Sequence, residues 1–257
     1  MSILSSIISV PMPLLGGFVL IIGFLYASVG FGGASGYLAV MSLFEIPASI
    51  AASTALSLNV IVAGTAFVNY SRKGHLRPRL LWPFVLTSIP AAFLGGTFHL
   101  EQLTYQILLN TILFYLGLRL LFAKDQGLSR KPLKIPSWSL ALISGVILGL
   151  LSGILGIGGG VFLSPLILLA GWGDTKQAAA SSAGFILLNS ISGLAGRASS
   201  GTLEYGSLGG ILLLLGLVGG LAGSYLGVHY LSHQAIRRIL GLVMLIAVVW
   251  FLIGWLR

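Results

Sequence analysis

The sequence contains no cysteine and few charged residues. The absence of cysteine excludes disulfides, iron–sulfur clusters and thiolate catalysis within the chain. Charged residues make up 7% of the 257 positions, whereas a soluble globular protein carries about 25%. So few charges cannot cover a water-soluble surface of this size. The composition therefore excludes an ordinary cytosolic enzyme, a soluble nucleic-acid-binding domain and a disordered chain.

Apolar residues dominate instead, at 56% of the chain, and the mean hydropathy is +1.03. Since a spanning helix needs about 20 apolar residues, we predict an all-α polytopic membrane protein with about eight transmembrane helices. The apolar stretches run over 14–44, 47–70, 80–99, 103–123, 138–170, 176–197, 207–230 and 235–256. The first and fifth are too long for a simple span, and each contains a glycine cluster. The sequence leaves open whether these two stretches span the membrane or re-enter it.

The distribution of basic residues predicts the orientation. Eleven lie on one predicted side, mostly in the loops after the second and fourth stretches, and three lie on the other: Lys176, Arg237 and Arg238. By the positive-inside rule, eight spans place the protein in the cell membrane with both termini in the cytoplasm, and Glu45, Glu101 and Asp174 outside. The net charge of +9 is then a topology signal and does not indicate a nucleic-acid partner. If either glycine-broken stretch re-enters, this assignment fails.

The two halves of the sequence resemble each other. Residues 23–34 match 149–160, residues 51–55 match 179–183, and Asn59 and Asn189 follow in the same order. We therefore predict a first transmembrane repeat over 14–123, a cytoplasmic linker over 124–137 and a second repeat over 138–256. Four spans in each half would make the repeats parallel. Repeats of this kind are frequent in secondary transporters, whose substrate site lies near the midplane at the repeat interface.

The glycine clusters predict breaks in the first and fifth helices. They comprise Gly30, Gly32 and Gly33 in the first stretch and Gly156, Gly158, Gly159 and Gly160 in the fifth. Each glycine weakens a helix by about 1 kcal/mol relative to alanine, and irregular backbone at membrane depth must be buried or line a wet cavity. A second helix beginning near Ser35 or Val161 would present free N–H groups with partial positive charge to an anion. The alternative is that the glycines only allow close helix packing.

Polar residues inside the predicted spans are further candidates for the substrate site. They are Ser53, Thr54, Asn59, Ser181, Ser182 and Asn189, with interhelical hydrogen bonding as the alternative role. Arg197 is a candidate counter-charge, and the alternative is a snorkelling end residue. No acidic residue lies deep in a predicted span, which favours an anionic substrate. We find no spacing typical of metal ligands and no catalytic constellation, so we expect no metal, no cofactor and no enzyme activity.

These motifs resemble those of the TauE/SafE family of sulfite-exporter-type membrane proteins. The resemblance rests on Gly149–Gly160 with Pro165 following, on the weaker copy Gly23–Ala34, and on the Ala-Ala-Ser segments at 51 and 179. It implies a secondary permease of the cytoplasmic membrane, commonly an exporter, for small sulfur-containing anions such as sulfite, sulfonates or related organic anions. An anion channel and a non-transporting scaffold or assembly factor stay as alternatives. The substrate, the direction, coupling to protons or another ion, and homo-oligomerisation are left open.

Overall fold

The computed structural model describes residues 12–98, 101–122, 136–205 and 209–230, with isolated positions between 232 and 253. The described helices are α2 Met12–Ser28, α3 Ala34–Leu43, α4 Ala48–Arg72, α5 Pro78–Thr97, α6 Gln102–Phe122, α7 Trp138–Leu155, α8 Gly160–Ala170, α9 Thr175–Ser199 and α10 Gly209–His229. Of these, α4, α5, α7, α9 and α10 are long and apolar enough to cross a membrane. The prediction of an all-helical membrane protein is confirmed. Residues 124–135 of the predicted linker and most of the predicted last span lie outside the described residues.

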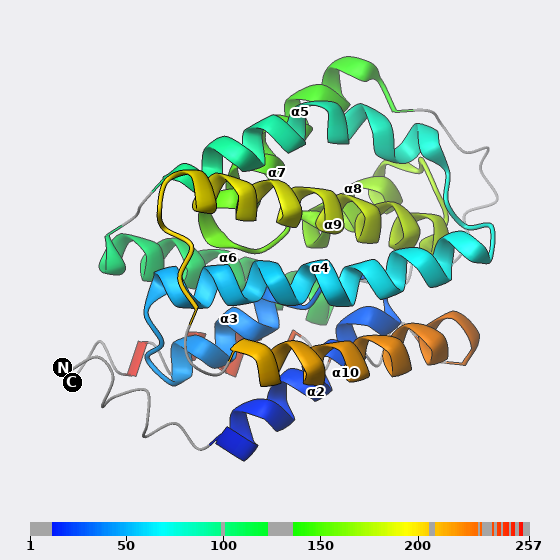
Figure 1. Cartoon of the computed structure of the whole chain (residues 1–257). Coiled ribbons are helices and arrows are strands. Elements are labelled where there is room, and N and C mark those ends of the chain that lie inside the picture. Colours follow the sequence, from blue (N-terminus) through cyan, green and yellow to red (C-terminus); the bar gives the residue numbers. More distant parts are fainter. Residues whose placement is uncertain are drawn as a thin grey trace.

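The helices pack in two groups that meet along α4 and α9 (Figure 1). The first group, here the α4 block, contains α2, α3, α4 and α10. The second, the α9 block, contains α5, α7, α8 and α9. Small residues allow the closest approaches, since a Cβ atom on Gly223 of α10 would collide with the backbone of Phe24 in α2, and one on Gly153 of α7 with that of Ala92 in α5. The two blocks are therefore densely packed units joined mainly through one helix pair.

The chain turns back at the first glycine break. The carbonyl oxygen of Ser28, at the end of α2, accepts a hydrogen bond of 2.9 Å from the Tyr70 hydroxyl, near the end of α4. The backbone N–H of Ala34, at the start of α3, donates to Asn59 in the middle of α4, and α3 continues toward Ala51 at the beginning of α4. Helices α2 and α3 thus form a hairpin. The stretch 14–44, for which the sequence left open spanning or re-entry, therefore turns back on itself.

The second break also reverses the chain, from the opposite end. Helix α7 runs parallel to α5, with Gly149 against Ser88, and α8 then returns toward the start of α5. There the ring of Trp172 packs on Phe84 with centroids 5.9 Å apart, and a Cβ atom on Gly173 would lie 2.8 Å from Leu80. Residues 138–170 are therefore a second hairpin and not one continuous span.

These reversals correct the predicted sides of the loops. The pKa of His75, after α4, is lowered by burial and by the charge of Lys176 at the start of α9, while Asp174 opposes the shift. The loops at 73–77 and 171–174 therefore share one end of the molecule, and the prediction that placed Asp174 and Lys176 opposite Arg72–Arg79 is wrong. Corresponding helices of the two halves, such as α4 and α9, run antiparallel and not parallel. The physical reason is that a chain that turns back at a break leaves from the side where it entered.

The two ends of the bundle differ in charge. The basic end carries Arg72, Lys73, Arg77 and Lys176, and it lies on the right in Figure 1. The acidic end carries Glu45, Glu101 and Glu204, on the left. The α2–α3 hairpin opens toward the acidic end and the α7–α8 hairpin toward the basic end.

Candidate functional site

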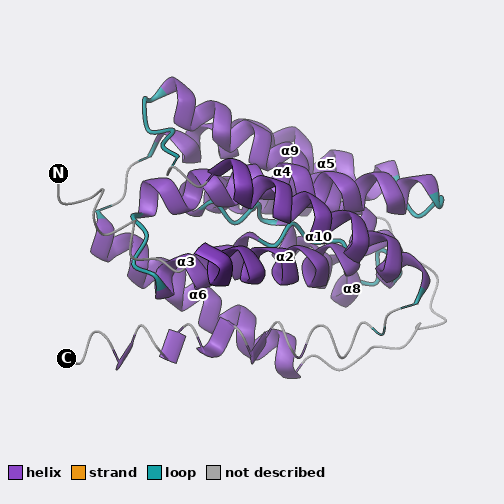
Figure 2. Cartoon of the chain, turned by 60° about the horizontal axis from the view of Figure 1, so that its bottom comes forward, coloured by secondary structure: helices purple, strands orange, loops and turns teal. Residues whose placement is uncertain are grey.

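Both glycine breaks lie in the interior of the bundle, where Figure 2 shows loop segments between the helices. Left-handed backbone conformations occur at Gly30 and Gly33, with φ of 80° and 94°, and at Gly156, Gly158 and Gly159, with φ of 74°, 80° and 68°. A side chain at such positions is strained, which explains the choice of glycine. Helices α3 and α8 restart at Ala34 and Gly160, each within one residue of the predicted restart. The predicted interruption of both helices is therefore confirmed.

One side chain connects the two breaks. Asn59, fully buried in the middle of α4, accepts a hydrogen bond of 3.1 Å at Oδ1 from the N–H of Ala34. Its Nδ2 donates a bond of 3.3 Å to the carbonyl oxygen of Ile157 in the second break. Because one partner is a donor and the other an acceptor, these bonds fix the orientation of the amide. The predicted site residues Gly32 and Gly158 both face Asn59, and both also face Ile186 of α9.

The breaks also pack crosswise against the two central helices. Gly30 lies against Ala179 of α9, and Gly156 lies against Ala52 of α4. These alanines belong to the Ala-Ala-Ser segments that the sequence comparison of the two halves singled out. Their short side chains let the backbone of each break approach within van der Waals contact. The segments therefore place the breaks at the contact between the α4 block and the α9 block.

The two breaks, residues 29–33 and 156–159, meet at Asn59, and this point is the junction. The N-termini of α3 and α8 both lie there. Helix α3 starts here and runs toward the acidic end, whereas α8 starts here and runs toward the basic end. A helix N-terminus carries about half a positive elementary charge. No charged residue occurs in either break, over 29–33 and 156–159. The N-termini of α3 and α8 thus supply partial positive charge from the backbone alone, a chemistry suited to an anion.

Helix α9 adds buried polar groups without partners. Ser181, Ser182, Asn189 and Ser190 are all fully buried. Within the described part of the chain, the hydroxyls of the three serines and Oδ1 of Asn189 have no hydrogen-bond partner, while Nδ2 of Asn189 donates to its own helix at Phe185. Of the four, Ser190 faces the second break, with Oγ 3.3 Å from the place of a Cβ atom on Gly158.

The sequence interpretation missed both Ser190 and Ile186. A signal was available, because Ser182, Ile186 and Ser190 are spaced by four residues and so share one helical face. A Cβ atom on Gly160, a predicted site residue, would collide with the carbonyl oxygen of Ser182 and the side chain of Ile186. This face of α9 therefore lines the second break.

Other predicted site residues have different surroundings. The Ser35 hydroxyl, at the start of α3, pairs with the Tyr26 hydroxyl at 3.0 Å. Ser53 lies toward the acidic end, where Oγ donates to Ser49 and accepts from the N–H of Glu204. Thr54 is buried beside it in α4. None of these hydrogen bonds joins Ser35 or Ser53 to Asn59.

Arg197 is not a snorkelling end residue, because its guanidinium is buried at the end of α7. Only 5% of its surface is exposed, and its Nη2 donates to the carbonyl oxygens of Gly153 and Ile154 at 3.2 and 3.0 Å. These carbonyls belong to the last turn of α7, whose C-terminus is negative. Arg197 therefore caps α7, just before the second break.

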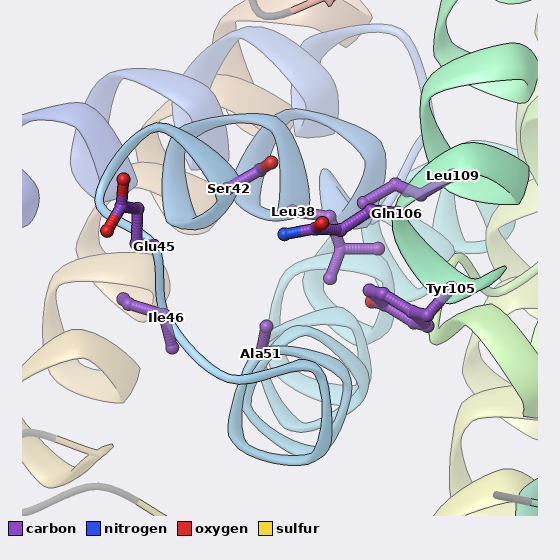
Figure 3. A pocket seen from close by; sticks show the side chains of 8 residues that line it. All are labelled: Leu38, Ser42, Glu45, Ile46, Ala51, Tyr105, Gln106 and Leu109. Atoms are coloured by element: carbon purple, nitrogen blue, oxygen red, sulfur yellow. The ribbon is translucent and has the colours of Figure 1, made fainter. Parts of the chain in front are cut away.

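A small pocket opens at the acidic end (Figure 3). It is lined by Leu38, Ser42, Glu45, Ile46, Ala51, Tyr105, Gln106 and Leu109. Ala51 precedes Ala52, which contacts Gly156, and the Tyr105 hydroxyl donates at 3.4 Å to the carbonyl oxygen of Leu155. The pocket therefore borders the beginning of the second break.

Comparison with known proteins gives a family. The sequence profile described as "Sulfite exporter TauE/SafE" matches residues 15–251. A probable membrane transporter protein from Sinorhizobium fredii is 34% identical over 88% of this chain and 92% of its own length. A probable membrane transporter protein from Methanocaldococcus jannaschii is 26% identical over 73% of this chain and 74% of its own. No solved structure matches significantly. The chain belongs to the sulfite exporter TauE/SafE family of membrane transporters.

Proposed function

We propose that this chain is a secondary carrier that moves small sulfur-containing anions, such as sulfite or sulfonates, across the cell membrane. The observation that carries the proposal is the pair of hydrogen bonds that joins Asn59, midway along α4, to both breaks. It brings the positive ends of α3 and α8 to one buried point. Such a point attracts an oxyanion, whose oxygens accept hydrogen bonds from backbone amides and hydroxyls.

The charge distribution of the described helices supports an anionic substrate. Four acidic residues lie between helices or at helix ends: Glu45, Glu101, Asp174 and Glu204. The residues of α4 and α9 that face the junction, Asn59, Ile186 and Ser190, are neutral. A carboxylate close to the junction would repel an anion in a low-dielectric interior. The name of the matching family supports sulfite among the small anions.

We also propose that the chain is built from two inverted repeats. Helix pairings support this layout, because α2 packs on α10 as α7 packs on α5, and α10 packs on α4 as α5 packs on α9. Inverted repeats with discontinuous helices at the midplane are a common transporter architecture. By the positive-inside rule, the basic end faces the cytoplasm. Helix α2 then begins on the outer side, which reverses the orientation expected from eight full spans.

The described state is closed around the junction. A methyl group on Gly32 or Gly158 would already collide with Asn59 and Ile186. We therefore propose that the anion reaches the junction when the α4 block and the α9 block move apart along α4 and α9. The pocket at the acidic end, which borders Gly156, is the proposed access route from outside.

Counterflow in proteoliposomes tests the carrier. We expect purified full-length protein to give saturable exchange of labelled sulfite or a sulfonate, and Gly158→Leu to abolish it while the protein still inserts. Gly17→Leu is the matched control, because a Cβ atom on Gly17 meets nothing within 4 Å. Fast non-saturating current would indicate a channel. Absence of flux, together with no anion-dependent thermal stabilisation, would indicate a non-transporting scaffold.

A further inference from the structure

We propose that the anion is held by the second break and not by both, and that Ser190 is its side-chain donor and determines affinity. This inference rests on the proposed function and assigns the anion to one side of the junction. It names a residue that lacks a counterpart in the first break. The ligand class is a small oxyanion with an oxygen within reach of the Ser190 hydroxyl.

The first argument is the orientation of the Asn59 amide. Its acceptor, Oδ1, faces the first break, where it takes the N–H of Ala34 and lies next to Gly32. Its donor, Nδ2, faces the second break, where it binds the carbonyl oxygen of Ile157 and lies next to Gly158. An amide nitrogen has two hydrogens, and one bond to Ile157 leaves the other for a ligand. An anion is therefore repelled by the oxygen on one side and attracted by the N–H on the other.

The start of α8 supplies the second argument. This eleven-residue helix has no side-chain cap at Gly159. The N–H of Gly160 donates to Gly158 and that of Phe162 to Gly159. Among the described residues, no hydrogen bond uses the N–H of Gly158, Gly159 or Val161. The positive end of α8 therefore lies at the junction, and no side-chain cap neutralises its free N–H groups.

Ser190 supplies the third and independent argument. Its side chain is fully buried, and Oγ has no partner among the described residues. Oγ lies 3.3 Å from the place of a Cβ atom on Gly158, so the hydroxyl faces the second break. Buried hydroxyls are almost always hydrogen-bonded, and an unpaired one in a site needs an explanation. A bound oxyanion would accept this hydrogen bond.

At the position equivalent to Ser190 the first break has an alanine, and its own buried hydroxyl without a partner among the described residues, that of Tyr37, lies beside Gly33 instead. Ala52 and Ala179, which pack on equivalent glycines of the two breaks, are 127 positions apart. The same spacing places Ala63 of α4 opposite Ser190 of α9. An alanine offers no donor. The two breaks thus share left-handed glycines at Gly30 and Gly33 and at Gly156 and Gly159, but only the second is left-handed at its middle glycine, Gly158, which Ser190 faces.

Isothermal titration with sulfite, and separately with a sulfonate, tests the assignment on the full chain in detergent. Since a hydrogen bond to a charged group is lost, we expect Ser190→Ala to raise Kd about tenfold to a hundredfold. We expect its unfolding temperature without ligand to stay near wild type. The matched control is Ser88→Ala, which removes another fully buried hydroxyl without a partner, in α5; its Kd should not change.

Three results would overturn the assignment. If Ser190→Ala keeps the wild-type Kd while Gly158→Leu abolishes binding, the proposed function stands and Ser190 is not the donor. If Ser190→Ala lowers the unfolding temperature without ligand far more than Ser88→Ala does, its role is structural. If the wild-type protein binds neither sulfite nor any sulfonate, the proposed function and this inference fail together.

Discussion

Replacing Asn59 with alanine tests the junction on which the proposed site depends. The substitution removes both hydrogen bonds that this side chain makes to backbone, at 3.1 Å from Ala34 and 3.3 Å to Ile157. It leaves a buried N–H and a buried carbonyl without partners. Each such group costs about 1–3 kcal/mol, so we expect the free energy of unfolding to fall by about 2–6 kcal/mol.

Asn69 provides a matched control in the same helix. Its Nδ2 donates to the Ser224 hydroxyl at 2.8 Å, and that hydroxyl also donates to the Gly220 carbonyl at 2.7 Å. The Asn69→Ala variant therefore leaves no buried group orphaned. Side-chain hydrogen bonds within membrane bundles contribute about 0.6 kcal/mol on average, so we expect a loss of about that size.

The assay is reversible unfolding of both variants in mixed detergent micelles, followed by circular dichroism. Sulfite counterflow in proteoliposomes gives the functional readout. We expect Asn59→Ala to be destabilised at least twice as much as Asn69→Ala and to lose transport. Equal destabilisation of the two variants, with counterflow retained in Asn59→Ala, would refute the reasoning that this amide holds the two breaks together.

Three further predictions follow from the same contacts. Gly158→Ala should lose about twice the stability of Gly171→Ala. Both positions have left-handed φ, which costs an alanine about 1–2 kcal/mol, but only at Gly158 would the new Cβ atom also collide, at 2.6 Å from Nδ2 of Asn59. Thermal unfolding of both variants checks this. Arg197→Met should lower the unfolding temperature, since it orphans two α7 carbonyls, while the Kd for sulfite stays unchanged; an altered Kd at an unchanged unfolding temperature would make Arg197 a counter-charge. Gly64→Cys with Leu187→Cys, on facing positions of α4 and α9, should stop counterflow when cross-linked and recover it after reduction; the absence of native cysteine leaves no background reaction.

The breaks could be predicted from the sequence because their cause is local. Several glycines within a few residues destabilise a helix wherever they occur, and the left-handed φ values at Gly158 and Gly159 are ones that other residues rarely adopt. The direction of the chain after each break has no local cause. It is set by contacts such as Tyr70 with Ser28 and Gly173 with Leu80. A count of spans that treats each long apolar stretch as one crossing cannot contain this information.

Apart from Arg197, the sequence predicted polar site residues only where both halves share them. Sequence matching paired Asn59 with Asn189, but the spacing set by Ala52 and Ala179 places Ile186 opposite Asn59. Asn189 instead bonds to its own helix at Phe185. Matching the two halves could not single out Ser190, because Ala63 occupies the equivalent position in the first half. A search for repeated residues finds the symmetric scaffold and misses the positions where the two halves differ.

The low charge content of the chain and an anionic substrate are compatible for a physical reason. Placing an arginine or lysine at the junction would cost the free energy of removing its charge from water, and that charge would hold an anion tightly in a low-dielectric interior. Backbone N–H groups at the start of α8 carry only partial charge and are already part of the folded chain, so they can attract an oxyanion and still release it. The basic residues can then remain at one end of the bundle, where Arg72 and Lys73 lie. Arg197 fits this scheme, since its charge is directed at the carbonyls of Gly153 and Ile154 in α7.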